Sequence, residues 1–216
     1  MNLIYIVNKV TPSYNEVKRE VDVLKLSQPW LTPERLSMLY AKKIRNKYAS
    51  VGVVTSLPGV IPGLGTAVQV VVETGSVSAD LVLMLRWMAS LCYGTAYIYG
   101  RDLQKDFETE FTTVLGLWSG ELTQEEVKNT KTSLLSVKHF DKHMAERIKN
   151  RMNQKVGRKL VAKYGSKRAG SALGKFIPFG IGAVVGGTFN YNTMHKFGRT
   201  ANDYFKEAPT LPISQL

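Results

Sequence analysis

The centre of this chain carries so few charges that it must be buried in a core or lie against lipid. No charged side chain occurs in residues 48–72, and residues 51–100 contain 29 apolar residues. Residues 176–195 are a second charge-free segment. A transmembrane helix needs about 20 continuous apolar residues, but prolines and glycines interrupt both segments. Each segment is therefore compatible with a buried helix, a re-entrant hairpin or an interfacial element.

Helix signals extend over almost the whole chain, whereas strand signals are weak. Pro33 suits the first position of a helix, and Gly100 suits the C-terminal cap of a long apolar helix. The expected helices begin after Ser13, at Pro33, near Leu64, after Ser78, at Asp102, after Thr123, at Asp141 and near Phe179. The sequence therefore predicts an all-α fold, a single bundle of about eight helices with two apolar helical hairpins broken by proline and glycine. We assign residues 1–208 to this domain and residues 209–216 to a frayed tail.

The net charge of +12 is concentrated in one part of the chain. Residues 138–175 alone contribute +10, and residues 141–164 place apolar side chains at four-residue spacing between basic ones, as in a basic amphipathic helix. The cations expected to contact an anionic partner are Lys149, Arg151, Lys155, Arg158, Lys159 and Lys163. A solvated helix face is the alternative. Nucleic acid is disfavoured because Tyr164 is the only aromatic residue in this helix.

Polar residues and glycines inside the apolar segments point to packing. Asp80 and Arg86 lie in an otherwise apolar helix, six residues apart, so a direct pair between them is disfavoured. We predict that Asp80, Arg86 and Arg199 are buried polar anchors, with a functional role for Asp80 as the alternative. The packing glycines are expected to be Gly182, Gly186 and Gly187, because small residues at such spacing let helix backbones approach closely.

No motif in the sequence predicts a catalytic, cofactor or metal site. The glycine-rich residues 59–65 lack the lysine that a phosphate-binding loop places before Thr66, and Val68 stands where a dinucleotide fingerprint has its third glycine. His139 and His143 have the spacing of two metal ligands, but no third ligand lies nearby and lysines surround them. We therefore predict no catalytic residue, no cofactor and no metal.

The cellular location follows from the cysteine content and the N-terminus. Cys92 is the single cysteine and lies in an apolar helix, so we expect a core residue in a reducing compartment. Residues 1–10 lack the basic region and cleavage site of a secretory signal. The expected location is the cytoplasm, at the inner face of a membrane.

Two stretches resemble the EcsC family. The first is Ala79-Asp80-Leu81, with Arg86 and Tyr99-Gly100-Arg101-Asp102-Leu103, preceded by the proline and glycine breaker of residues 58–65. The second is residues 182–191, followed by Gly198-Arg199-Thr200-Ala201 and Tyr204-Phe205. Ser78 departs from the pattern, since a proline or glycine is expected before Ala-Asp. The resemblance implies a helical protein with a membrane-proximal accessory role, linked to an ABC transporter or a secretion system, and it supplies no catalytic residues.

Three functional hypotheses follow. The first, which we favour, is a non-enzymatic accessory protein bound to an anionic membrane surface or a membrane protein complex. The second is a soluble helical module that docks an acidic protein partner. The third is an enzyme centred on Asp80, Arg86 and Arg199, and it requires these side chains to share one site.

Overall fold

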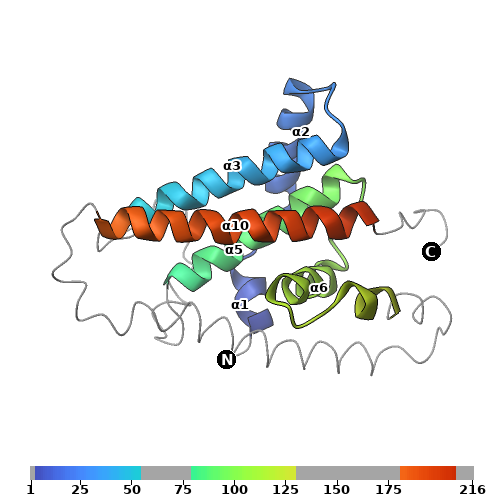
Figure 1. Cartoon of the computed structure of the whole chain (residues 1–216). Coiled ribbons are helices and arrows are strands. Elements are labelled where there is room, and N and C mark those ends of the chain that lie inside the picture. The colour runs from blue at the N-terminus through green and yellow to red at the C-terminus, as the bar shows by residue number, and fades with distance from the viewer. Residues whose placement is uncertain (1–2, 55–78, 130–180, 208–216) are drawn as a thin grey trace.

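A computed structural model of the chain describes residues 3–54, 79–129 and 181–207, and no strand occurs in these ranges (Figure 1). The six labelled helices are α1 (Leu3–Val10), α2 (Tyr14–Ser27), α3 (Pro33–Val54), α5 (Ala79–Ile98), α6 (Phe107–Ser119) and α10 (Ile181–Glu207). Residues 124–129 are also helical. The all-α prediction is confirmed.

Helix α5 is the centre of the bundle, because it packs against each of α1, α2, α3, α6 and α10. Its residues are apolar on all sides, and those from Leu81 to Leu85 are all buried. A helix that is hydrophobic all round needs neighbours on every side. Figure 1 shows α10 and α3 side by side, with α5 behind α10. The apolar segment around residue 90 is therefore the core of the domain.

Local capping signals predicted several helix ends correctly. The backbone N–H of Thr123 donates to Glu126 Oε2 at 2.8 Å, and the Glu126 N–H donates to Thr123 Oγ1 at 3.2 Å. This reciprocal pair is a capping box, and it confirms the predicted helix start after Thr123. Gly100, with φ +79°, follows the end of α5. Only glycine adopts this left-handed backbone conformation without strain.

The prediction of a helix from residue 102 is wrong at its start. α6 begins at Phe107, five residues later. The Asp102 carboxylate accepts the backbone N–H of Gln104 at 2.8 Å, so it forms a local turn and does not cap a helix. Leu103 in this turn is buried in the core. The acidic residues, which were expected to stabilise the helix dipole, instead shape the connection between α5 and α6.

Helix α1 was not predicted. Its sequence is rich in β-branched residues, which have modest helix propensity. Ile6, Val7 and Val10 are buried, and α1 packs against α5. The Arg86 guanidinium on α5 donates to the Val10 carbonyl at 3.0 Å, so it satisfies a carbonyl at the end of α1. Tertiary packing therefore stabilises a helix that is not predicted from its own sequence.

Several predicted features lie outside the described residues. They are the short helix at 64–74, the basic helix at 141–164, the proline and glycine breakers of the two apolar hairpins, and the tail at 209–216. The domain boundaries at 1–208 and 209–216 stay predictions.

Candidate anion-binding surface

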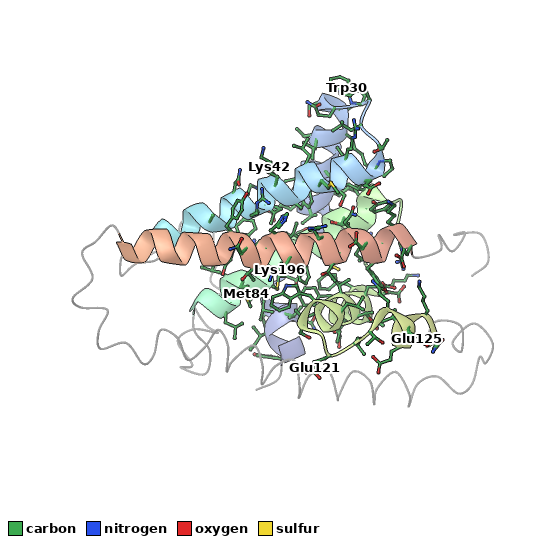
Figure 2. All side chains as sticks on the ribbon, in the orientation of Figure 1. Trp30, Lys42, Met84, Glu121, Glu125 and Lys196 are labelled. Atoms are coloured by element: carbon green, nitrogen blue, oxygen red, sulfur yellow. The ribbon has the colours of Figure 1, made fainter. Side chains whose placement is uncertain are left out.

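Arg45, His195 and Arg199 lie together where α3 and α10 pack, and exposed Lys42 and Lys196 lie on the same two helices. They form a surface that we call the basic seam, which consists of Lys42, Arg45, His195, Lys196 and Arg199. Arg45 and His195 lie at the contact between the two helices, whereas Lys42, Lys196 and Arg199 are exposed beside it. Figure 2 shows Lys42 on α3 and Lys196 on α10, near the middle of the two helices. The α3 and α10 segments of this surface are 150 residues apart in the chain.

Arg45 is the best-positioned member of the basic seam. Its guanidinium carbon lies 4.0 Å from the centroid of the Tyr191 ring, a cation–π geometry. Its Nη1 lies 2.9 Å from Nδ1 of His195. A guanidinium can only donate, so this contact assigns the acceptor role to Nδ1 and the proton of the neutral imidazole to Nε2. Two rings from α10 therefore hold the guanidinium in place at the seam.

Like charges dominate the electrostatics of the basic seam. The pKa of His195 is lowered by burial and then by the positive charges of Arg45 and Arg199. None of the five seam residues forms an ion pair with a carboxylate in the described ranges. Other lysines of α3 and α10 do form such pairs, namely Lys43 and Lys47 with Glu20, and Lys206 with Glu34. A multivalent anion such as a phosphate would supply the missing negative charge.

A glycine allows the two helices that carry the seam to approach closely. A Cβ atom on Gly198 would lie 3.0 Å from the Cβ of Ala41, tighter than ordinary van der Waals contact. Gly182, Gly186 and Gly187 also lie on α10, although their packing partners are not described. The sequence analysis did not single out Gly198 for packing, because the close approach depends on a residue of α3.

A second charged site lies beside α10 and is largely buried. We call it the buried polar cluster, formed by Arg101, Glu110 and Tyr204. Arg101 Nη2 lies 2.9 Å from Glu110 Oε1, and the Tyr204 hydroxyl donates to Glu110 Oε2 at 2.5 Å. The guanidinium carbon of Arg101 also lies 5.3 Å from the centroid of the Phe205 ring. Burial and the Glu110 carboxylate raise the pKa of Tyr204, so its hydroxyl stays a donor.

Sequence reasoning missed this cluster because Glu110 lies in a segment rich in acidic residues, where a carboxylate is ordinarily exposed to solvent. Glu110 is only 9% exposed. Its position four residues after Asp106 gave no local sign of a partner at Tyr204, 94 residues away. Cys92 is buried as predicted, and burial with the nearby Glu110 carboxylate raises its pKa well above the usual range. A thiol with a raised pKa is a poor nucleophile, so Cys92 acts as a core residue.

The structure describes the side chains of two of the three predicted buried polar anchors, Arg86 and Arg199. Arg86 is partly buried and donates to the Val10 carbonyl, which makes it an anchor for α1. Arg199 is exposed, so its prediction as a buried anchor is wrong. The buried face of α10 is formed by Met194, Phe197 and Ala201, and Arg199 lies off this face. The side chain of Asp80 is not described.

The remaining predicted site residues cannot be placed. Lys149, Arg151, Lys155, Arg158, Lys159 and Lys163 lie outside the described residues, as do His139 and His143. Within 3–54, 79–129 and 181–207, no group of three or more His, Cys, Asp or Glu side chains is arranged to hold a metal ion.

One helix among those described is long and apolar enough to cross a membrane. Its apolar window is Leu81–Ile98 of α5, and 83% of that window is buried inside the bundle. The core helix of a soluble protein has the same length and composition, so this feature is weak evidence for a membrane span.

The comparison with known proteins identifies the family of this chain. The EcsC protein family matches residues 60–207, which include α5, α6 and α10. No curated protein and no solved structure matches the chain. The described α1, α2 and α3 precede the matched range. Because the match covers more than half of its 216 residues, the chain belongs to the EcsC protein family.

Proposed function

We propose that this EcsC protein is a non-enzymatic accessory protein that binds the anionic cytoplasmic face of a membrane. The observation that carries this proposal is the basic seam, where Arg45, His195 and Arg199 lie together, and exposed Lys42 and Lys196 lie on the same two helices, without a carboxylate partner in the described ranges. Each Lys or Arg near an anionic leaflet contributes roughly 1 kcal/mol of attraction. The four permanent cations of the seam are therefore sufficient for measurable binding.

The rest of the chain supports the same partner. Residues 138–175 add a net charge of +10 and the whole chain has a net charge of +12, so the protein as a whole is attracted to an anionic surface. Most of the apolar window of α5 is buried inside the bundle, so the contact that we propose with the membrane is peripheral. A role beside an ABC transporter or a secretion system belongs to the same proposal and rests on the family alone.

Vesicle co-sedimentation of the full chain tests this function. The vesicles contain phosphatidylcholine alone or with phosphatidylglycerol. The seam variant combines Lys42→Glu, Arg45→Glu, Lys196→Glu and Arg199→Glu. The matched control combines Lys43→Glu, Lys47→Glu, Lys128→Glu and Lys206→Glu, which make the same change in net charge at lysines that already have carboxylate partners. Circular dichroism establishes that each variant is folded.

We expect the wild-type protein to bind only the anionic vesicles, and the seam variant to lose at least about tenfold more affinity than the control. A third variant, with Lys149, Arg151, Lys155 and Arg158 changed to Glu, measures the share of the predicted basic helix. Equal binding to neutral and anionic vesicles would overturn the electrostatic part. Absence of binding to either would remove the membrane hypothesis and favour an acidic protein partner.

A further inference from the structure

Helix α2 has two apolar faces, and the bundle uses only one of them. Val17 and Val21 are buried against the core. Val23, Leu26 and Trp30 are 64%, 81% and 73% exposed, and we call them the apolar tip. Val23 and Leu26 are three residues apart on one side of the helix, away from the buried valines. Trp30 lies in the turn after α2, which ends at Ser27. Figure 2 shows Trp30 at the outer end of the corner between α2 and α3.

Polar contacts on both flanks of α2 keep the apolar tip pointing outward. On one flank the Tyr97 hydroxyl donates to Asp22 Oδ1 at 2.7 Å, and Lys25 Nζ lies 4.1 Å from the centroid of the Tyr97 ring. On the other flank Glu20 pairs with Lys43 and Lys47 of α3. These contacts fix the orientation of α2 on the bundle, and in this orientation the apolar tip is exposed.

The charges around the tip favour an anionic partner. Three carboxylates near the tip are engaged within the bundle: Asp22 accepts from Tyr97, Glu20 pairs with Lys43 and Lys47, and Glu34 pairs with Lys206 at 2.9 Å. Glu16, near the start of α2, is exposed. Arg19 and Arg35 are exposed, and neither has an acidic partner in the described part of the chain. Adjacent exposed apolar side chains mark interaction sites. Cations beside an apolar centre are typical of segments that lie at the lipid interface.

The tip and the basic seam are connected along α3. Arg35, Met38 and Lys42 are exposed and recur at spacings of three and four residues, so they share one side of the helix. This line begins at the corner that carries Trp30 and ends at the seam residue Lys42. An anionic surface that contacts the tip can therefore also meet Arg35 and the seam residue Lys42.

We propose that Val23, Leu26 and Trp30 insert into the boundary between headgroups and acyl chains of an anionic bilayer. This inference rests on the membrane association proposed above, and it adds an apolar anchor to the electrostatic one. Trp is enriched at membrane interfaces because its ring is apolar and its N–H is polar. Arg19 and Arg35 then meet the phosphates, while the three apolar side chains leave water.

Tryptophan fluorescence of the full chain tests the insertion. The chain has three tryptophans, and Trp87 and Trp118 are both partly buried. Anionic vesicles with brominated acyl chains should quench the wild-type emission, and Trp30→Phe should remove most of that quenching. The double variant Leu26→Ser/Trp30→Ser should bind the vesicles about tenfold or more weakly, since two apolar side chains no longer leave water. Tyr5→Ser, at a side chain 57% exposed on α1, is the matched control and should bind normally.

The outcomes separate the tip from the proposed function. If the wild-type protein binds anionic vesicles, but the double variant binds equally well and Trp30 is not quenched, the tip inference is overturned and the proposed function stands. If the wild-type protein does not bind, both are overturned. If the wild-type protein is a dimer that the double variant dissociates, with vesicle binding unchanged, the tip contacts a second copy and the lipid inference is overturned.

Discussion

Two charged regions lie along α10 and differ in how their charges are compensated. In the buried polar cluster, Tyr204 and Arg101 both contact Glu110, whose side chain is 12% exposed. In the basic seam, His195, Lys196 and Arg199 are exposed beside Arg45, with no carboxylate partner in the described ranges. The two regions are less than three helical turns apart on one helix.

This difference in charge compensation indicates that the polar cluster contributes to stability, whereas the seam is available for binding. A buried charge without a partner costs several kcal/mol, so the polar cluster must be paired for the fold to persist. An exposed cation remains solvated, so leaving it without an ion-pair partner costs little free energy. The cations of the seam are therefore available to a binding partner. Changes in the cluster should therefore alter unfolding, and changes in the seam should alter anion binding.

The largest effect on stability is expected for Glu110→Gln. The substitution leaves the Arg101 guanidinium, whose side chain is 17% exposed, without its counter-charge. We expect the free energy of unfolding to fall by about 3 kcal/mol. Urea denaturation followed by circular dichroism measures it. Labelling of the native protein at Cys92, its single cysteine and a buried one, should accelerate by about a hundredfold if labelling follows global opening.

The control is an exposed pair of the same chemistry. Glu34→Gln breaks the pair with Lys206, whose side chains are 51% and 44% exposed, and should cost about 0.5 kcal/mol or less. Adding Arg101→Gln to Glu110→Gln should restore part of the loss, because the uncompensated charge is removed. Equal losses in the free energy of unfolding for Glu34→Gln and Glu110→Gln would contradict the predicted difference between buried and exposed charges.

A smaller effect is expected for Tyr204→Phe. The ring remains in the core, but the hydrogen bond to Glu110 Oε2 is lost. A hydrogen bond to a charged group contributes about 1.5 kcal/mol or more, so unfolding should become easier by about that amount. The same urea titration measures it, with Tyr99→Phe as a control because the Tyr99 hydroxyl donates to the neutral Asn202 side chain at 2.9 Å. A larger loss for Tyr99→Phe would contradict the prediction.

A seam substitution should leave stability almost unchanged. Arg199→Gln removes an exposed charge, so we expect a change within about 0.5 kcal/mol. The same substitution should raise the pKa of His195 toward its ordinary value of 6.5, because one of the repelling charges is gone. NMR titration of the imidazole protons measures this shift. A pKa that does not move would show that Arg199 is not a member of the seam.

The smallest effect is a pH dependence of the seam. The pKa of His195 is lowered in the folded protein, so the unfolded chain binds this proton more readily, and the contribution of His195 to stability falls as pH decreases below about 6.5. A bound anion favours the imidazolium and reverses this penalty. Affinity for anionic vesicles should therefore rise as pH falls through the pKa of His195. His195→Gln should reduce this rise, and an unchanged profile in that variant would assign it to other groups.

The helical fold could be predicted from local sequence patterns, because helix caps and breakers act within a few residues. Pro33 begins α3, the pair Thr123 and Glu126 forms a capping box, and Gly100 follows the end of α5. The resemblance to the EcsC family rested on equally local strings, and the family match confirms it. Cys92 was predicted as a core residue because it lies in a continuous apolar helix.

The contacts between polar side chains could not be predicted in this way, because they depend on how the helices pack. Arg45 and His195 are 150 residues apart, and Glu110 and Tyr204 are 94 apart, so no local pattern pairs them. The docking of α10 against α3 and α6 exposes Arg199 and buries Glu110, the reverse of the expectation from composition. The physical reason is that periodicity identifies the apolar face of a helix, whereas the partner of each polar group depends on how the helices pack.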